Sequence, residues 1–351
     1  MKVSFFLILF FLFNILFSKA VVVNPGKPLN PEAGKVIKLK KVYEISGEAE
    51  DYVLIKPYKL DLAANGVMLI SDHKQLLLFT PAGKFIKNLY KQGQGPGEMH
   101  RRISAAISGD RIYIHVPILR KLIISDLNGK LLKEKKVEMH ELVGKIGERF
   151  LFRRSNLSDL RSEYLRKRRR NTGGSTFYAL KNTFLFYSLS TGEEKIVGEF
   201  PSKHLLSNSV TPMERMKFRL YKDKLLLTHT GEYLVKIVDL KNGGIKQFSR
   251  QYKRVENTSP SKNRRKYIQD IKSLHVFKKH IWVKTSTEDP EKGYLFDVFD
   301  FDGRYIDAFY LGSKGYISKI DGDFIYLTRK DEDYNFYIVK YKVLDYHKSA
   351  K

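Results

Sequence analysis

Residues 93–99 read Gly-Gln-Gly-Pro-Gly-Glu-Met and separate two apolar stretches, one ending near Leu89 and one beginning near Ile103. Glycines on both sides of a proline are typical of a tight turn between strands. We interpret this turn as a joint between two units of a repeat, with the structural residues Gly95, Pro96, Gly97 and Glu98.

The chain on both sides of the joint repeats one pattern. Two short stretches rich in β-branched and aromatic residues precede a turn that starts with Asp, Ser or Thr and ends with Gly, and a further such stretch follows. A type I turn closed by a left-handed glycine suits such a hairpin. The turn glycines are 46, 63, 51 and 60 residues apart, at Gly83, Gly129, Gly192, Gly243 and Gly303. Short strands in units of this length predict a β-propeller.

Six units can be counted between residues 36 and 345, and the last lacks its outer strand. A strand-like stretch over residues 36–45 remains unassigned at the other end. Pairing it with the last unit would hide two strand edges at once. The sequence therefore predicts an all-β, six-bladed β-propeller as a single domain over residues 36–345. An N-terminal strand completes the last blade and closes the ring, and residues 346–351 form a tail.

The joint at residues 93–98, following Pro-Ala-Gly-Lys-Phe-Ile at residues 81–86, resembles the bacterial secreted six-bladed β-propeller family related to NHL repeats. The resemblance covers the chain after residue 20 in its rhythm, but the sharp motif occurs once. It implies the six-bladed fold. It implies no particular activity, because many members have none that is defined and one fold hosts unrelated functions.

The first 20 residues have the features of a secretory signal peptide. Lys2 precedes an apolar run from Phe5 to Phe17, and small residues follow up to Ala20. The run of 13 residues is shorter than the ~20 that a transmembrane helix needs. We expect cleavage near Ala20, a flexible Pro- and Gly-rich lead-in over residues 21–35, and a mature protein in the periplasm or outside the cell. With no cysteine, disulfides and thiol chemistry are excluded.

The net charge of +26 predicts an anionic partner, namely an envelope glycan, lipid head groups in peripheral membrane contact, or an acidic protein. The signal peptide argues against nucleic acid. Residues 153–170 hold eight Lys or Arg against two acids, and residues 250–266 hold seven against one. We interpret both as basic insertions, over about 153–176 and 250–266. The alternative is a pair of solvated loops without a ligand.

In a four-stranded blade, the loops after the second and fourth strands lie on one face. Both basic insertions and the joint at 93–99 follow such strands, so we expect them on one face, and the six second strands end there too. We predict axial binding residues Arg153, Arg154, Lys284, Arg329, His115 and His229, and an outer patch of Arg166, Arg168, Arg169, Arg264 and Arg265. With Asp72 as the lone carboxylate at these strand ends, no metal is expected. No cofactor motif is present.

Three functions are compatible with these observations. The favoured one is a non-catalytic, monomeric binding or scaffold propeller whose basic face takes an anionic partner. The alternative is a lactonase- or hydrolase-like enzyme with an axial pocket for an anionic or sugar-derived substrate. His115, His229 and Asp72 would be its acid–base groups, and it requires a histidine and a carboxylate within hydrogen-bond distance. The third is a structural module without a small ligand.

Overall fold

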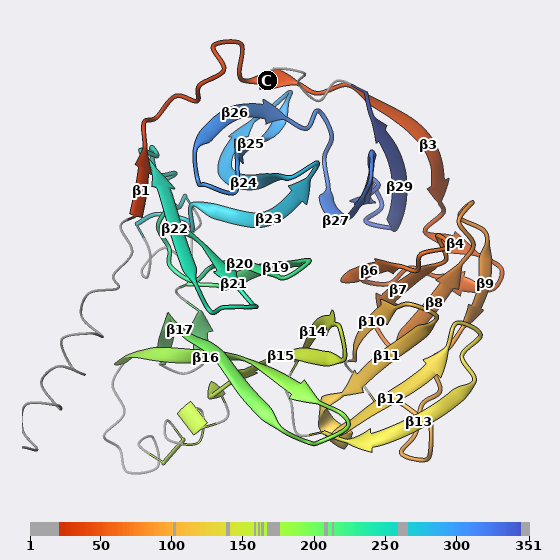
Figure 1. The fold of residues 1–351 in the computed structure, drawn as a ribbon. Helices are drawn as coiled ribbons and strands as arrows, with labels where there is room; N and C mark the ends of the chain where they lie inside the picture. Colours follow the sequence, from red (N-terminus) through yellow and green to blue (C-terminus); the bar gives the residue numbers. More distant parts are fainter. Residues whose placement is uncertain are drawn as a thin grey trace, which may run out of the picture.

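The computed structural model describes residues 21–100, 103–137, 141–157, 159–160, 162, 165–166, 176–206, 210–212, 214–258 and 266–344. Within these ranges, six antiparallel sheets surround a common axis, as Figure 1 shows. The predicted all-β, six-bladed propeller is confirmed. The signal peptide predicted over residues 1–20 and the tail at 346–351 lie outside the described ranges.

Each blade has four strands from the axis outward, in sequence order except in blade 6, whose outer strand comes from the N-terminal side. Blades 3, 4 and 5 each carry a short fifth strand. Blades 1 and 2 comprise β6 (Lys59–Leu62), β7 (Met68–Asp72), β8 (Gln75–Phe79) and β9 (Phe85–Asn88), then β10 (Ser104–Ser108), β11 (Arg111–Val116), β12 (Lys121–Asp126) and β13 (Leu131–Lys136). Blade 3 comprises β14 (Glu141–Ile146), β15 (Arg149–Ser155), β16 (Thr176–Ser188), β17 (Glu194–Leu206) and β18 (Val210–Pro212).

Blades 4 and 5 comprise β19 (Lys217–Tyr221), β20 (Lys224–Thr228), β21 (Val235–Asp239) and β22 (Ile245–Arg250), then β23 (Ile271–Phe277), β24 (His280–Asp289), β25 (Gly293–Phe299) and β26 (Tyr305–Tyr310). Blade 6 comprises β27 (Tyr316–Asp321), β28 (Phe324–Lys330) and β29 (Phe336–Val343). A hairpin of β4 (Glu48–Ala49) and β5 (Tyr52–Val53) precedes blade 1, and the 3₁₀ turn η1 (Pro117–Leu119) follows β11.

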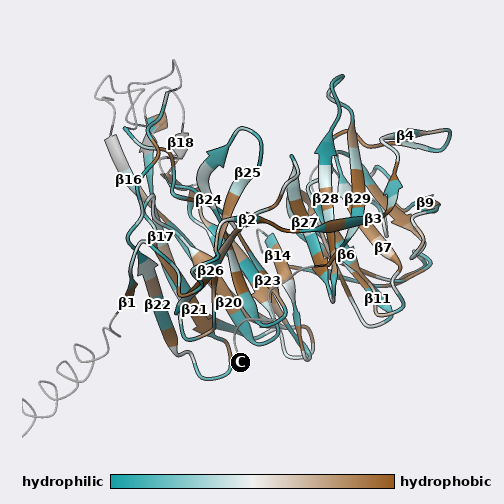
Figure 2. Cartoon of the chain, turned by 90° about the horizontal axis from the view of Figure 1, so that it is seen from above, coloured by the Kyte–Doolittle hydropathy of each residue, from teal (hydrophilic) through white to brown (hydrophobic). Residues whose placement is uncertain are grey.

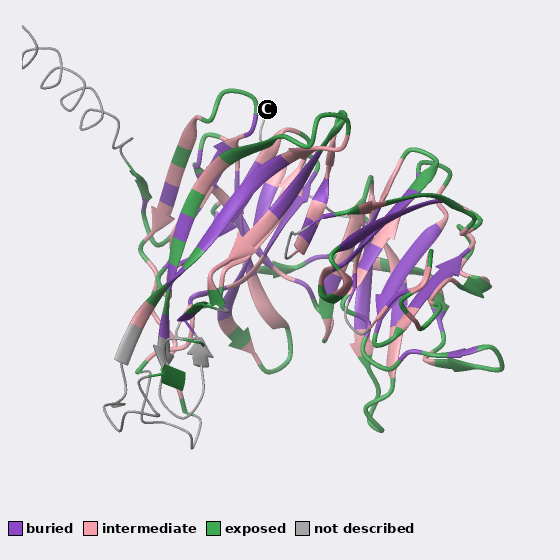
Figure 3. Cartoon of the chain, turned by 90° about the horizontal axis from the view of Figure 1, so that it is seen from below, coloured by how far each residue is buried: buried purple, intermediate pink, exposed green. Residues whose placement is uncertain are grey.

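The core is divided among the interfaces between neighbouring blades. Leu69 and Leu78 of blade 1 pack against Ile112 and Ile114 of blade 2, and the other interfaces repeat this arrangement. Middle strands that are covered on both faces must be apolar throughout, which explains why β7 reads Met-Leu-Ile before its polar end. Figures 2 and 3 show hydrophobic, buried residues along the strands and exposed ones at the loops.

The turn chemistry predicted from sequence is confirmed at the hairpins between third and fourth strands. The five turn glycines have φ between +75° and +86°, the left-handed region that favours glycine. At Gly303 the backbone N–H donates to the Asp300 carbonyl at 3.2 Å.

The ring closes as the sequence predicts. β3 (Leu39–Ile45) pairs antiparallel with β29, from Ile45 opposite Ile338 to Leu39 opposite Val343, and supplies the fourth strand of blade 6. Strands from the two ends of the chain therefore share one sheet. In Figure 1, β3 lies along β29 at the outer edge of this blade.

Residues 21–35, for which the prolines predict a flexible lead-in, instead follow the outer edges of blades 4 and 5 (Figure 1). β1 (Val21–Asn24) pairs parallel with β22, and β2 (Lys35–Val36) pairs parallel with β26. The buried Asn24 amide donates to the Ser249 and Gly303 carbonyls at 2.9 and 2.8 Å and accepts from the Tyr305 N–H at 2.9 Å. Outer strands offer unpaired backbone groups, and this segment satisfies them.

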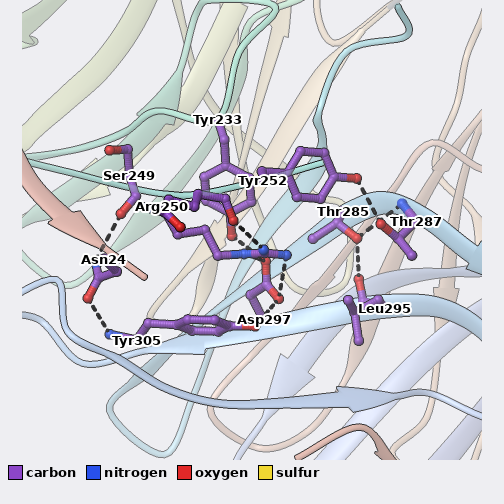
Figure 4. A network of polar contacts seen from close by, with 11 residues as sticks. Asn24, Tyr233, Ser249, Arg250, Tyr252, Thr285, Thr287, Leu295, Asp297 and Tyr305 are labelled. Carbon is purple, nitrogen blue, oxygen red and sulfur yellow. Dashed lines mark hydrogen bonds and ion pairs between the residues drawn. The ribbon is translucent and has the colours of Figure 1, made fainter. Parts of the chain in front are cut away.

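A buried polar network also joins blades 4 and 5 (Figure 4). The Asp297 carboxylate accepts from Arg250 Nε at 2.7 Å and Nη2 at 3.1 Å, and from the hydroxyls of Tyr233 at 2.6 Å and Tyr305 at 2.7 Å. The guanidinium carbon lies 4.8–5.1 Å from the ring centres of these tyrosines and Tyr252. No helix in the described part of the chain is both long and apolar enough to span a membrane.

Candidate functional site

A cavity of about 850 Å³ lies at the axis of the ring. Its walls come from the first strands of five blades, β6, β10, β14, β19 and β27, together with η1 and the end of β15. The starts of first strands pair with the ends of second strands, as Glu141 pairs with Arg153. The cavity wall therefore includes the end of β15, from which the basic insertion at about 153–176 departs.

Cationic side chains outnumber carboxylates in this wall. The cations are Lys59, Lys145, Arg153, Arg219 and Lys319, and the carboxylates are Asp61 and Glu141. Such an imbalance inside a partly enclosed space gives a positive potential that attracts anions.

Both carboxylates are already engaged by a cation of the wall. Lys319 Nζ lies 2.5 Å from Asp61, which also accepts the Ile107 backbone N–H at 3.0 Å. Burial acts to raise the pKa of Asp61, but the charges of Lys319 and Lys59 and these hydrogen bonds hold it below its usual value. Arg153 Nη2 lies 2.6 Å from Glu141. Neither acid is free to serve as a general base.

Lys59 and Arg219 are half-buried cations with no ion pair to a described carboxylate. Arg219 Nε donates to the Leu274 carbonyl at 3.4 Å, and Nη2 lies 3.4 Å from His275 Nδ1. Burial lowers the pKa of Lys59. The charges of Asp61 and Glu141 oppose this shift, and those of Lys319 and Arg219 increase it. The two cations therefore lie in one electrostatic environment, around Asp61.

Ser273 and His275 form a hydroxyl–imidazole contact of 2.8 Å beside this cavity, through His275 Nε2. A serine nucleophile needs an imidazole that accepts its proton and a carboxylate on the other ring nitrogen. Here a guanidinium donates to Nδ1, so the ring proton resides on Nε2 and points to Ser273. Burial, followed by the charges of Arg219 and Lys284, holds the pKa of His275 well below its usual value. In this pair the imidazole donates to the serine, whereas in a catalytic pair the imidazole accepts the proton of the serine.

The acid–base groups predicted for an enzyme make structural contacts. Asp72 accepts the backbone N–H groups of Ile55 at 2.7 Å and Lys56 at 2.5 Å. His229 Nδ1 lies 2.6 Å from the Pro201 carbonyl, and burial lowers its pKa. His115 is buried edge-on against Phe152, with ring centres 5.4 Å apart. These contacts do not favour the enzyme alternative.

The predicted basic residues are dispersed. Arg153 lines the cavity, whereas Arg154 lies on the exposed side of β15 and donates to Glu194 at 3.4 Å. Arg329 donates to the Tyr341 hydroxyl at 3.3 Å. Arg166 is exposed. The predicted residues that lie outside the described ranges are Arg168, Arg169, Arg264 and Arg265.

Lys284, in contrast, belongs to a group of cations at the blade 4–blade 5 side of the axis. We call it the rim cluster, and it comprises Arg215, Lys217, Lys272 and Lys284. Lys217 begins β19, Lys272 is the extra residue of a bulge in β23, and Lys284 pairs with Ser273 beside that bulge. A bulge re-aims a side chain relative to the regular strand. Arg215 precedes β19 and is exposed.

The rim cations act on one another. Burial lowers the pKa of Lys217, and the charges of Arg215 and Lys272 lower it further. Burial lowers the pKa of Lys284 to about 8, with Lys272 adding to the effect and Glu288 opposing it. Lys284 Nζ donates to the Gly315 carbonyl at 3.3 Å and lies 3.9 Å from the Tyr294 ring centre. Among the described residues, none of the three lysines has a carboxylate within ion-pair distance, although the charge of Glu288 acts on Lys272 and Lys284.

Sequence reasoning missed Arg215, Lys217, Lys272, Lys59 and Arg219. Each lies in or just before a first strand, and these strands carry mixed polar and apolar residues without a distinguishing motif. The motif at the joint has structural contacts instead. Glu98 accepts the Gly95 N–H at 2.8 Å, the Gly97 N–H donates to Glu134 at 2.9 Å, and Lys121 Nζ donates to the Gly95 carbonyl at 2.8 Å.

Comparisons with known proteins agree on the fold. A solved structure of a candidate exported protein from Bacteroides fragilis NCTC 9343 is similar to this chain, with 12% sequence identity and a TM-score of 0.54. The match covers 93% of this chain and 100% of that chain. A member of the duf4221 family from Bacteroides vulgatus ATCC 8482 is 12% identical with a TM-score of 0.55, over 89% of this chain and 99% of that one. Comparison with curated proteins gives no match.

A gluconolactonase from Xanthomonas campestris is matched at 12% identity over 90% of this chain and 99% of that one, but its TM-score of 0.46 supports no functional argument. Residues 35–209 match the model of the DUF5128 family, described as a 6-bladed beta-propeller. The relation to NHL repeats stays a prediction. The chain is thus a six-bladed β-propeller, and residues 35–209 carry the pattern of that propeller family.

Proposed function

We propose that this protein is a non-catalytic, extracytoplasmic binding propeller that takes an anionic partner at the axial end bearing the rim cluster. The observation that carries the proposal is the gathering of Lys217, Lys272 and Lys284 without a carboxylate at ion-pair distance among the described residues. Cations that repel one another and have lost part of their hydration gain free energy when an anion approaches.

The partner that fits this end is a multivalent anion. The cluster spreads four cations over two neighbouring blades, and a polyanionic glycan, an anionic lipid surface or an acidic protein segment offers several charged groups to them at once. The predicted signal peptide supports the extracytoplasmic setting. The reversed Ser273–His275 pair and the engaged carboxylates count against catalysis at the same end.

Equilibrium binding tests the proposal and separates the partners. The chain beginning at Val21 is titrated with a polyuronate, with a neutral dextran, and with anionic and zwitterionic vesicles. We expect binding to the anionic members alone, weakening as salt rises. A Lys217→Gln/Lys272→Gln variant should bind more weakly.

A matched control removes two exposed lysines from outer strands, Lys87→Gln and Lys133→Gln, and changes net charge by the same amount. It should bind almost as the native chain does. Equal loss in both variants would show that net charge alone matters and would refute the rim cluster as the site. Absence of binding to every anionic probe would refute the function itself.

A further inference from the structure

We propose that the axial cavity is a binding site for a small carboxylate- or phosphate-bearing molecule, with Lys59 and Arg219 as the two side chains that hold its anionic group. This site is separate from the rim cluster, because it lies in the cavity wall and uses different residues. It would give the propeller a small-molecule ligand in addition to the multivalent partner proposed above.

The cavity wall contains cations whose charge is balanced and cations whose charge is not. Lys319 and Arg153 are paired with Asp61 and Glu141 at 2.5 and 2.6 Å, and Lys145 lies 3.4 Å from the exposed Glu148. Of the cations in this wall, only Lys59 and Arg219 have no carboxylate within ion-pair distance among the residues that the structure describes, although the charge of Asp61 acts on both. An anion in the cavity would supply the missing counter-charge.

Arg219 is held in place by acceptors that leave its charge intact. The Leu274 carbonyl carries no charge, and the ring of His275 is neutral because its Nδ1 accepts from the guanidinium, a state that the lowered pKa of this histidine favours. These contacts use Nε and Nη2, and no described residue hydrogen-bonds Nη1. A guanidinium fixed by neutral groups is a pre-oriented donor for a carboxylate or phosphate oxygen.

Lys59 stands at the start of β6, two residues before Asp61. Residues two apart in a strand point to the same face, so Lys59 and Asp61 share one side of β6, and both line the same cavity as Arg219. Asp61 is satisfied by Lys319 and the Ile107 N–H and does not neutralise Lys59 at ion-pair distance. Lys59 of blade 1 and Arg219 of blade 4 thus both line the cavity, and the charge of Asp61 acts on both.

The hydroxyl groups of the cavity wall predict that the site distinguishes ligands by their charge and not by the positions of their hydroxyls. The hydroxyls of Tyr58, Ser104 and Tyr316 donate to the carbonyls of Ile103, Leu142 and Pro57. Because these groups bond within the protein, they have little capacity to read a ligand. A volume of about 850 Å³ is typical of small-molecule sites and accommodates a molecule of sugar-acid size.

Calorimetric titration of the chain beginning at Val21 tests this inference. The probes are glucuronate, inorganic phosphate and neutral glucose. We expect binding of glucuronate, phosphate or both and none of glucose, and the two anions distinguish carboxylate from phosphate chemistry. Arg219→Gln and Lys59→Met should each weaken anion affinity about tenfold or more, the effect of losing a charge-assisted hydrogen bond.

Lys145→Gln is the matched control, because it removes from the same wall a cation that is already paired with Glu148. The affinity of this variant for the anions should change less than about threefold, because the lost charge was already balanced. Both test variants remove an uncompensated cation and should stay folded, and each is informative alone. No heat with either anion at millimolar concentration, or affinity unchanged in both variants, would overturn the inference.

Failure here is distinguishable from failure of the proposed function. If polyuronate binding still depends on Lys217 and Lys272 while neither small anion binds, the cavity inference alone is wrong. If small anions bind through Lys59 and Arg219 while polyanions do not bind, the proposed multivalent partner is wrong.

Discussion

Replacement of Asp297 by alanine should be among the most damaging single changes in the ring. The side chain of Arg250 is 7% exposed and that of Asp297 is fully buried, so the mutation leaves a guanidinium inside the protein without its counter-ion. Removing one partner of a buried ion pair costs about 3–5 kcal/mol. The two tyrosine hydroxyls lose an acceptor at about 1 kcal/mol each, less where water enters. We expect the free energy of unfolding to fall by about 4–6 kcal/mol.

Urea denaturation measures this loss, with the slope m checked for constancy so that the change in midpoint reports stability. The double variant Asp297→Ala/Arg250→Met removes the stranded charge. It should be more stable than Asp297→Ala alone, because the cost comes from the unpaired cation and not from the absent contact. A single-mutant loss below about 1.5 kcal/mol, or a double mutant less stable than the single, would refute this reasoning.

Three further changes probe the frame that holds the site. Gly303→Ala should lower the free energy of unfolding by more than the ~1–2 kcal/mol of left-handed strain, because the new Cβ would lie 2.8 Å from Phe248. Gly243→Ala, where the Cβ would meet open space, should cost the strain alone, and equal losses in the two variants would contradict this. Asn24→Ala removes three hydrogen bonds and should cost about 2–3 kcal/mol by urea denaturation, and a loss near zero would show that β1 does not stabilise the ring. The pKa of His275 is lowered in the folded chain, so below about pH 6.5 the unfolded chain binds a proton that the folded chain does not, and stability should fall as pH drops below that value. His275→Gln should make stability depend less on pH in this range, and an unchanged pH dependence would contradict a buried, neutral His275.

The fold could be predicted from sequence because its signals are local. A turn glycine such as Gly83 or Gly303 marks the third hairpin of its blade whatever the rest of the chain does, and the interval between such turns gives the blade. The closing strand followed from an edge that needed a partner. The role of residues 21–35 could not be predicted, because β22 and β26 already complete four-stranded units in the repeat, so no unit lacked a strand that these residues would supply.

The site was less accessible to sequence reasoning for a geometric reason. The predicted axial residues end the second strands, but the cavity wall is formed largely by first strands. Three of those strands, β14, β23 and β27, contain a bulge that shifts the facing by one residue. Lys272 reaches the rim through such a bulge, and a strict alternation of inward and outward residues does not reveal it.

The excess of basic residues was visible in the composition, but the positions of the cations to which we assign anion binding were not. The two basic insertions hold 15 of the 64 Lys and Arg residues, whereas most of the cations to which we assign anion binding are single lysines and arginines in or just before first strands. Lys284 was the predicted residue that joined this group. Its pKa of about 8 also gives a direct consequence, since anion binding at the rim should weaken as pH rises through 8 and the lysine loses its proton.

The most direct test of the account is the salt dependence of polyuronate affinity for the native chain and for Lys217→Gln/Lys272→Gln. If the rim cluster binds the anion, the logarithm of affinity falls with the logarithm of salt concentration in the native chain. The slope should be shallower by about one to two counter-ions in the variant, with Lys87→Gln/Lys133→Gln unchanged. A slope that is the same in all three proteins, or affinity that does not respond to salt, would contradict the claim that this end of the ring is an anion-binding surface.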